Sequence, residues 1–129
     1  MPKDVGDEGG FRISARQVDP DIVLVAIAGD LDVVTVLQTT TFLTQATAVT
    51  PRRLILDLSG VTFLTSSGIG LLIAAADDTI HGQLHLLGVT DNRQVQRPLA
   101  SAGLLDHFDI APDLDTLLAR LHTIKPPAV

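Results

Sequence analysis

Residues 56–70 read LDLSGVTFLTSSGIG, a stretch in which an aliphatic strand pattern passes directly into a helix pattern. Its first residues continue an apolar run that is typical of a strand buried on both faces. Ser59 and Gly60 are turn-forming residues, and we expect Val61 and Phe63 to anchor the segment that follows in the core. A strand that leads into a helix is the building unit of α/β domains, so this stretch predicts such a domain.

Three hydroxyl residues, Thr65, Ser66 and Ser67, open the predicted helix. The side chain of Thr65 or of Ser66 is well placed to accept the free N–H groups of the first turn. One interpretation is a capping cluster, in which two nearby glycines allow tight packing. The other is an anion or phosphorylation site, because exposed N–H groups and the helix dipole favour negative charge at a helix start.

Two apolar runs near the start of the chain predict an antiparallel hairpin. Residues 11–16 alternate apolar and polar side chains, which is the period of a half-exposed strand. Residues 22–28 are continuously apolar, which suits a buried strand. The sequence Asp-Pro-Asp at residues 19–21 supplies a short turn between them. We therefore expect a hairpin over residues 11–28 at the edge of the sheet.

Residues 33–48 are expected to form a helix because the segment is too long for a strand and Asp32 is a suitable N-cap. The apolar residues predicted for its buried face are Val33, Val36, Leu37 and Leu43. Phe42 lies opposite this face, so we expect it to sit under a loop or to be exposed to solvent.

Strand and helix patterns continue to alternate along the rest of the chain. The further expected elements are strand 54–58, a helix from Ile69 to near Gly82, strand 84–87, helix 92–102 with Thr90 or Asp91 as its cap and Gly103 as its stop, strand 108–110 and helix 114–121. The predicted fold class is α/β, with a mostly parallel sheet of about five strands, an N-terminal antiparallel edge strand and about four helices. Residues 1–10 and 125–129 are expected to be flexible tails.

The composition argues against several classes of function. The chain has 129 residues, 46% of them hydrophobic, which fits one domain with an aliphatic core. A net charge of −6 and only four aromatic residues argue against nucleic-acid binding. The lack of cysteine excludes thiol catalysis, disulfides and thiolate metal sites. No apolar stretch suits a signal peptide or a membrane span, so we expect a cytoplasmic protein without membrane insertion.

No catalytic or cofactor motif is visible in the sequence. The four histidines, His81, His85, His107 and His122, lack metal-ligand spacing and are expected on the surface or in loops. The G-x-S-x-G elbow of serine hydrolases is not formed, because Leu64 stands at the position of its first glycine. We therefore expect no enzymatic activity, no cofactor and no metal.

Residues 57–70, DLSGVTFLTSSGIG, resemble the signature of STAS domains, specifically that of the bacterial anti-sigma factor antagonists. Upstream, the sequence AGDLD at residues 28–32 is similar to the family's second motif, Gly-Glu-Leu-Asp. Asp30 replaces the usual Glu and keeps its charge, whereas Thr65 stands where many members carry Asp. The resemblance implies a STAS domain over residues 11–124.

The resemblance also implies a partner switch. Family members bind an anti-sigma factor, which is itself a serine kinase of the histidine-kinase-like ATPase fold, and thereby free a sigma factor. The kinase phosphorylates the serine that corresponds to Ser66, and a protein phosphatase of the 2C type reverses this. The implied partner-binding residues are Asp32, Thr65, Ser66, Ser67 and Gly68. An alternative is a STAS accessory subunit of a membrane lipid ABC transporter, and a small serine hydrolase is a more remote one.

Overall fold

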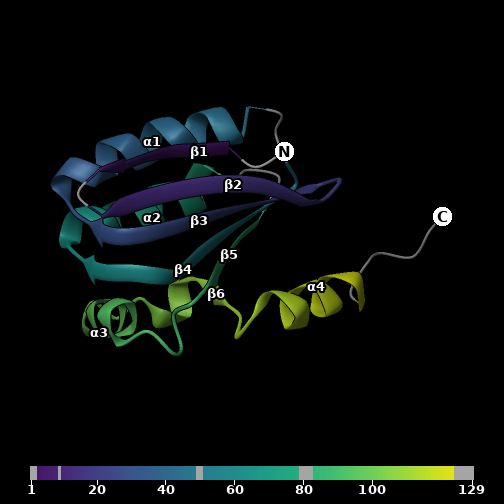
Figure 1. The fold of residues 1–129 in the computed structure, drawn as a ribbon. Coiled ribbons are helices and arrows are strands. Elements are labelled where there is room, and N and C mark those ends of the chain that lie inside the picture. Colours follow the sequence, from purple (N-terminus) through teal and green to yellow (C-terminus); the bar gives the residue numbers. More distant parts are fainter. Residues whose placement is uncertain (1–2, 9, 49–50, 79–82, 124–129) are drawn as a thin grey trace.

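The computed structural model describes residues 3–8, 10–48, 51–78 and 83–123 and shows a sheet flanked by helices (Figure 1). Within these ranges the sheet has six strands in the order β1-β2-β3-β4-β5-β6. The elements, in chain order, are β1 (Lys3–Glu8), β2 (Phe11–Asp19), β3 (Ile22–Leu31), α1 (Val33–Ala46), β4 (Arg53–Leu64), α2 (Ser66–Asp78), β5 (Gln83–Leu87), α3 (Arg93–Ser101), the single 3-10 turn η1 (Leu105–His107), β6 (Asp109–Ile110) and α4 (Leu114–Thr123). Strands β3 to β6 pair in parallel, so the predicted α/β class is confirmed.

The N-terminal segment differs from the prediction, because β1 occupies most of the stretch expected to be a flexible tail. This strand pairs antiparallel with β2, with Val5 opposite Ile13. Pairing with a free strand edge uses backbone groups and needs no apolar pattern, so the composition of residues 1–10 did not indicate it. The hairpin of β2 and β3 is confirmed, but β1 takes the edge position predicted for residues 11–16.

Each face of the sheet carries its own apolar core. Side chains alternate along a strand, so Val23 and Val25 of β3 belong to one core while Ile22 and Leu24 belong to the other. The first core packs against α1 and α2, and α4 covers the second core from the opposite side of the sheet through Leu117 and its neighbours (Figure 1).

Helix α1 begins after Asp32 as predicted but buries a different face. Phe42 is only 3% exposed, whereas Leu37, predicted to be buried, is 71% exposed. The buried face also includes Thr39, whose hydroxyl donates to the Thr35 carbonyl at 2.9 Å and is thereby satisfied without water. The predicted buried face of α1 was wrong because it assumed that only apolar residues are buried. A threonine whose hydroxyl is satisfied within the helix can be buried as well.

Strand β4 continues through the dipeptide that was predicted to form a turn. Its pairing with β3 shifts between Ala26 and Ala28, and this irregularity lets the strand run on to Leu64. Gly60 lies so close to β3 that a Cβ atom there would be 2.8 Å from the Cβ of Ala28. Val61 is buried as expected, but Phe63 is 56% exposed and does not anchor the segment in the core.

The second half of the chain follows the predicted order of elements. Helix α3 is capped by Asn92 rather than by Thr90 or Asp91, because the Asn92 side chain both accepts from Gln94 N–H and donates to carbonyls of β4. Gly103, with a φ of +71°, follows this helix as predicted. The predictions at Gly82, His81 and residues 125–129 lie outside the described residues.

Candidate functional site

The starts of α1 and α2 lie side by side because the two strands before them end together. Leu31, the last residue of β3, is paired in parallel with Leu64, the last residue of β4. Asp32 and Thr65 therefore follow neighbouring strands at the same edge of the sheet (Figure 1). Thr65 binds the Leu31 carbonyl twice, through its backbone N–H at 3.2 Å and through its hydroxyl at 3.1 Å. These bonds tie the two helix starts to one backbone group.

Asp32 caps α1, as the sequence predicted. Its carboxylate accepts from the backbone N–H groups of Val34 and Thr35, both at 3.0 Å. The Thr35 hydroxyl in turn accepts from the Asp32 N–H at 2.9 Å, which completes a reciprocal capping box. The backbone hydrogen bond from Thr35 is the main cause that lowers the pKa of Asp32 below its ordinary value. The site therefore carries a fixed negative charge at neutral pH.

Thr65 occupies the corresponding place before α2, and this decides between the two hydroxyls proposed as cap. Its hydroxyl oxygen accepts from the Gly68 N–H at 3.4 Å, and its carbonyl accepts from the Ile69 N–H at 2.9 Å. The hydroxyl of Thr65 is thus engaged in two directions at once.

Ser66, in contrast, is the first residue of α2 and is exposed. Within the part of the chain that the structure describes, its side chain makes no hydrogen bond. Ser67, the next residue, is half-buried. The first turn of α2 holds no acidic residue, so its free N–H groups and the helix dipole remain available to an added negative charge.

Gly68 sets how closely α2 approaches the strand ends. It is buried, and a Cβ atom at this position would lie 2.6 Å from Cδ1 of Leu64 and 2.8 Å from the Leu31 carbonyl oxygen. A side chain here would push the first turn of α2 away from the sheet. The absence of a side chain at Gly68 thus lets α2 pack closely against the strand ends, and its role in partner binding stays a prediction.

An exposed apolar surface, which the sequence pattern did not indicate, borders Asp32. It consists of Val33, Val34 and Leu37 on the first two turns of α1, which are 68%, 64% and 71% exposed, and we call it the α1 patch. Asp30, also exposed, lies just before Asp32 and accepts from the Thr62 hydroxyl at 2.6 Å. Large side chains exposed together beside polar groups are typical of protein-binding surfaces. The signal in the sequence was the high count of apolar residues in this helix, assigned to the wrong face.

Among the described residues, no histidine or carboxylate is hydrogen-bonded to Ser66. Over the same residues no group of three or more His, Asp or Glu side chains is arranged to hold a metal ion.

One histidine prediction is wrong. His85 is 2% exposed and lies within β5, whereas it was expected on the surface or in a loop. His107 and His122 are exposed. The local sequence did not indicate that His85 is buried, because the residues that hydrogen-bond to it come from distant parts of the chain.

The family model of the STAS domain matches residues 14–117. The chain therefore belongs to the STAS domain family, which is a class of α/β domains. Its fold and the strand-to-helix stretch at residues 57–70 both correspond to this class. No curated protein matches the chain significantly in sequence. In the ranges that the structure describes, no helix combines the length and apolar character needed to cross a bilayer.

Solved structures show the same fold at low sequence identity. An anti-sigma factor antagonist from Mycobacterium paratuberculosis superposes with a TM-score of 0.75 over 95% of both chains, at 22% identity. The phosphorylated form of the Bacillus cell fate determinant SpoIIAA gives 0.64 over 84% of this chain and 98% of that chain, at 20% identity. SLC26A9 gives 0.66 over 79% of this chain but only 20% of that chain, at 17% identity.

Proposed function

We propose that the protein is a non-enzymatic anti-sigma factor antagonist whose binding is switched off by phosphorylation of Ser66. In this function it binds an anti-sigma factor that is a serine kinase of the histidine-kinase-like ATPase fold, and a sigma factor is released. A phosphatase of the 2C type restores the binding form, and the exchange takes place in the cytoplasm. The observation that carries the proposal is Ser66 itself, an exposed and unbonded hydroxyl on the first residue of a firmly positioned helix.

The position of Ser66 suits a switch that acts on binding rather than on folding. A phosphate adds about −1.5 to −2 charges at neutral pH. At the first turn of a helix such a charge is mildly stabilising, by roughly 0.3–1 kcal/mol. Phosphorylation is therefore expected to leave the domain folded. Pressed against a partner, the same group loses hydration and faces acidic side chains, which weakens the complex.

The α1 patch supports a protein as the binding partner. Its apolar side chains directly follow Asp32, and Leu31 before them pairs with Leu64 at the start of the Ser66 segment. A partner that covers Ser66 is thus well placed to bury the patch as well. Burial of exposed apolar surface supplies affinity for such a partner.

The test is phosphorylation and binding with the cognate anti-sigma factor. The full chain is incubated with that protein and ATP, the phosphate is mapped by mass spectrometry, and affinities are measured by calorimetric titration. Ser66→Ala is expected to abolish phosphate incorporation and keep binding, whereas Ser66→Glu weakens binding with little change in Tm. Ser101→Ala, which changes an exposed serine at the end of α3, is the matched control and is expected to behave as the unmodified chain does. Equal affinity before and after phosphorylation, or phosphate on Thr65 or Ser67, contradicts the proposal.

A second candidate is an accessory subunit of a membrane lipid ABC transporter. It is supported by the structural similarity to a segment of SLC26A9, whose chain is about five times as long as the part matched, and by Thr65 in place of the Asp common at phosphorylation sites. Co-purification from the native cell separates the two. An ATPase-fold anti-sigma factor supports the first candidate, and a transporter ATPase supports the second.

A further inference from the structure

His85 is a buried titratable group at the sheet face that α4 covers. It is 2% exposed, and its register partners are Ile55 on β4 and Asp109 on β6. Ile55 belongs to the small core beneath α4, so the imidazole lies next to this core. The Ser66 site is formed where β4 ends, whereas His85 contacts Arg53 where β4 begins. The group is therefore separate from the proposed switch.

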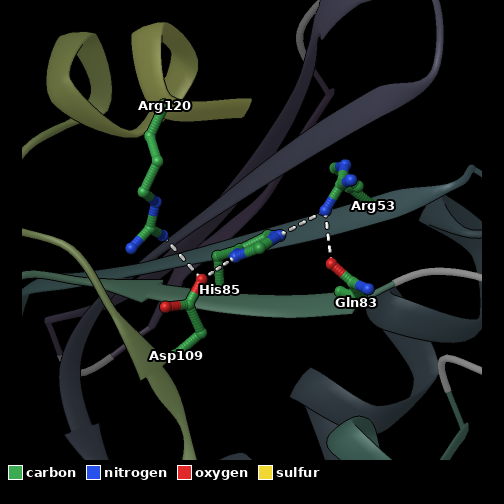
Figure 2. A network of polar contacts seen from close by, with 5 residues as sticks. All are labelled: Arg53, Gln83, His85, Asp109 and Arg120. Carbon is green, nitrogen blue, oxygen red and sulfur yellow. Dashed lines mark hydrogen bonds and ion pairs between the residues drawn. The ribbon is translucent and has the colours of Figure 1, made fainter. Parts of the chain in front are cut away.

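Four elements of the fold meet through this imidazole (Figure 2). Its Nδ1 atom contacts the Asp109 carboxylate of β6, and the same carboxylate oxygen accepts from Nη2 of Arg120 on α4 at 2.7 Å. Its Nε2 atom lies 3.2 Å from Nη1 of Arg53 on β4. Arg53 also donates to Oε1 of Gln83 at the start of β5, at 2.5 Å.

These partners fit one protonation state of the ring. A carboxylate can only accept, so Nδ1 must carry the proton that it donates to Asp109. A guanidinium can only donate, so Nε2 must present a lone pair to Arg53. The neutral tautomer with its proton on Nδ1 satisfies both contacts. A second proton on Nε2 would place two donors and two positive charges 3.2 Å apart.

We propose that His85 is a proton-sensitive latch, which in its neutral form helps to hold α4 on the sheet and on protonation loosens that helix. Strand β6 has only two residues, so its own backbone pairing is short. The Arg120–Asp109–His85 chain of contacts adds a polar link from α4 to β5. When Nε2 takes up a proton, Arg53 must leave the ring, and the imidazolium draws Asp109 away from Arg120. Helix α4 is then held mainly by its apolar contacts.

Other charged groups near α4 also affect how firmly this helix is held on the sheet. His107 on η1 lines the same hollow as His85, Gln83 and Asp109. His122 on α4 lies 3.2 Å from the Asp19 carboxylate of β2. Protonation of His122 strengthens that pair, so it opposes the release of α4 in acid. The effect of His85 is therefore measured most clearly in a chain that lacks His122.

The electrostatic surroundings agree with a neutral ring. Burial is the main cause that lowers the pKa of His85 below its ordinary value of 6.5. Asp109 acts in the opposite direction, and the guanidinium groups of Arg53 and Arg120 lower the pKa further. Below pH 6.5 the unfolded chain therefore binds a proton that the folded chain does not, so this group's contribution to stability is complete above that pH. The contribution is lost as the pH falls from there toward the lowered pKa.

The first experiment identifies the tautomer and the titration of His85 in the unmodified full chain. Long-range proton–nitrogen NMR correlations of the imidazole are expected to show the proton on Nδ1 at neutral pH. Arg53→Gln removes the cation beside Nε2 and is expected to shift the titration of His85 to higher pH. A proton on Nε2 at neutral pH, or a titration of His85 that is not shifted below its ordinary value of 6.5, overturns the proposal.

The second experiment measures release of α4 by hydrogen exchange, with rates corrected for intrinsic pH dependence. In His122→Gln, we expect the protection of α4 relative to β3 to fall about tenfold between about pH 7.5 and pH 5.5. In His122→Gln with His85→Gln, the relative protection is expected to be independent of pH. An equal fall in both chains, or no fall in either, overturns the proposal. If the double variant does not fold, the NMR experiment together with exchange in His122→Gln decides.

Discussion

The hydroxyl of Thr65 donates to the carbonyl of Leu31 at a distance of 3.1 Å, and so connects the start of α2 to the end of a neighbouring strand. The same hydroxyl caps α2 by accepting from Gly68. An aspartate, which many members of the family carry at this position, could accept from the helix but could not donate to Leu31. In this chain a neutral side chain therefore performs both tasks directly beside Ser66.

Thr65→Val is expected to destabilise the protein because it removes both bonds of the hydroxyl while keeping the shape of the side chain. The loss of a helix cap and of a partly buried hydrogen bond should lower the free energy of unfolding by about 1–2 kcal/mol. Denaturation in urea measures the change. Thr65→Ser, which keeps the hydroxyl, is the control, and Thr65→Asp should fall between the two. A valine variant as stable as the serine variant would show that neither bond matters.

Two glycines in α2 are expected to respond to alanine in opposite directions. In Gly68→Ala, the new methyl group meets the Leu31 carbonyl and the Leu64 side chain, so we expect a loss of about 1–3 kcal/mol. In Gly70→Ala, the new Cβ meets no atom within 4 Å beyond its chain neighbours and the backbone of its own helix, and alanine should gain about 0.5–1 kcal/mol through its higher helix propensity. Unfolding free energies of the pair test the close approach, and a stabilising Gly68→Ala would refute it.

Asp32 has a structural role as a cap and a proposed role in partner binding, and one substitution separates them. Asn caps helices about as well as Asp, so Asp32→Asn should keep Tm nearly unchanged but weaken binding and phosphorylation by the anti-sigma factor. Asp32→Ala removes the cap and should also lower Tm by a few degrees. Thermal melts and calorimetric titration give both quantities. Normal partner binding by the asparagine variant would show that Asp32 acts only as a helix cap.

The lowered pKa of Asp32 predicts how the stability that the cap provides changes in acid. Its pKa is lowered in the folded protein, mainly by the hydrogen bond from the Thr35 backbone. Its contribution to stability is therefore complete above the ordinary value of 3.8 and is lost as the pH falls through the lowered pKa. Melts of the unmodified chain in acid should show this loss, and Asp32→Asn should lack that component.

The α1 patch and the core beneath it make a matched pair of sites on one helix. Leu37→Ser changes a side chain that is 71% exposed, so it should alter stability by no more than about 0.5 kcal/mol. If the patch contacts the partner, the same change should reduce affinity by about tenfold or more. Phe42→Ala, in the core, should instead cost about 3–5 kcal/mol of stability. Unchanged affinity in Leu37→Ser would place the interface elsewhere.

Local chemistry made much of the fold and part of the site predictable. The N-caps Asp32 and Thr65 bind groups within three or four residues of themselves, so their sequence neighbours already define the interaction. The alternation of strand and helix patterns depends on the same short range, and it gave the α/β class and the places of both helix starts. The resemblance at residues 57–70 singled out Ser66 but could not show that its hydroxyl is exposed and unbonded.

The tertiary structure alone decided which face of α1 is buried, that β1 completes the sheet and that His85 lies inside. Each of these depends on groups far apart in the chain. Phe42 of α1 is buried because core residues from several strands pack around it. His85 is buried because Arg53 and Asp109 come to it from other strands, and β1 joins the sheet because the free edge of β2 offers backbone partners. Local patterns record the preferences of side chains for water. Burial of polar groups is set by which distant partners satisfy them, and only the assembled fold supplies those partners.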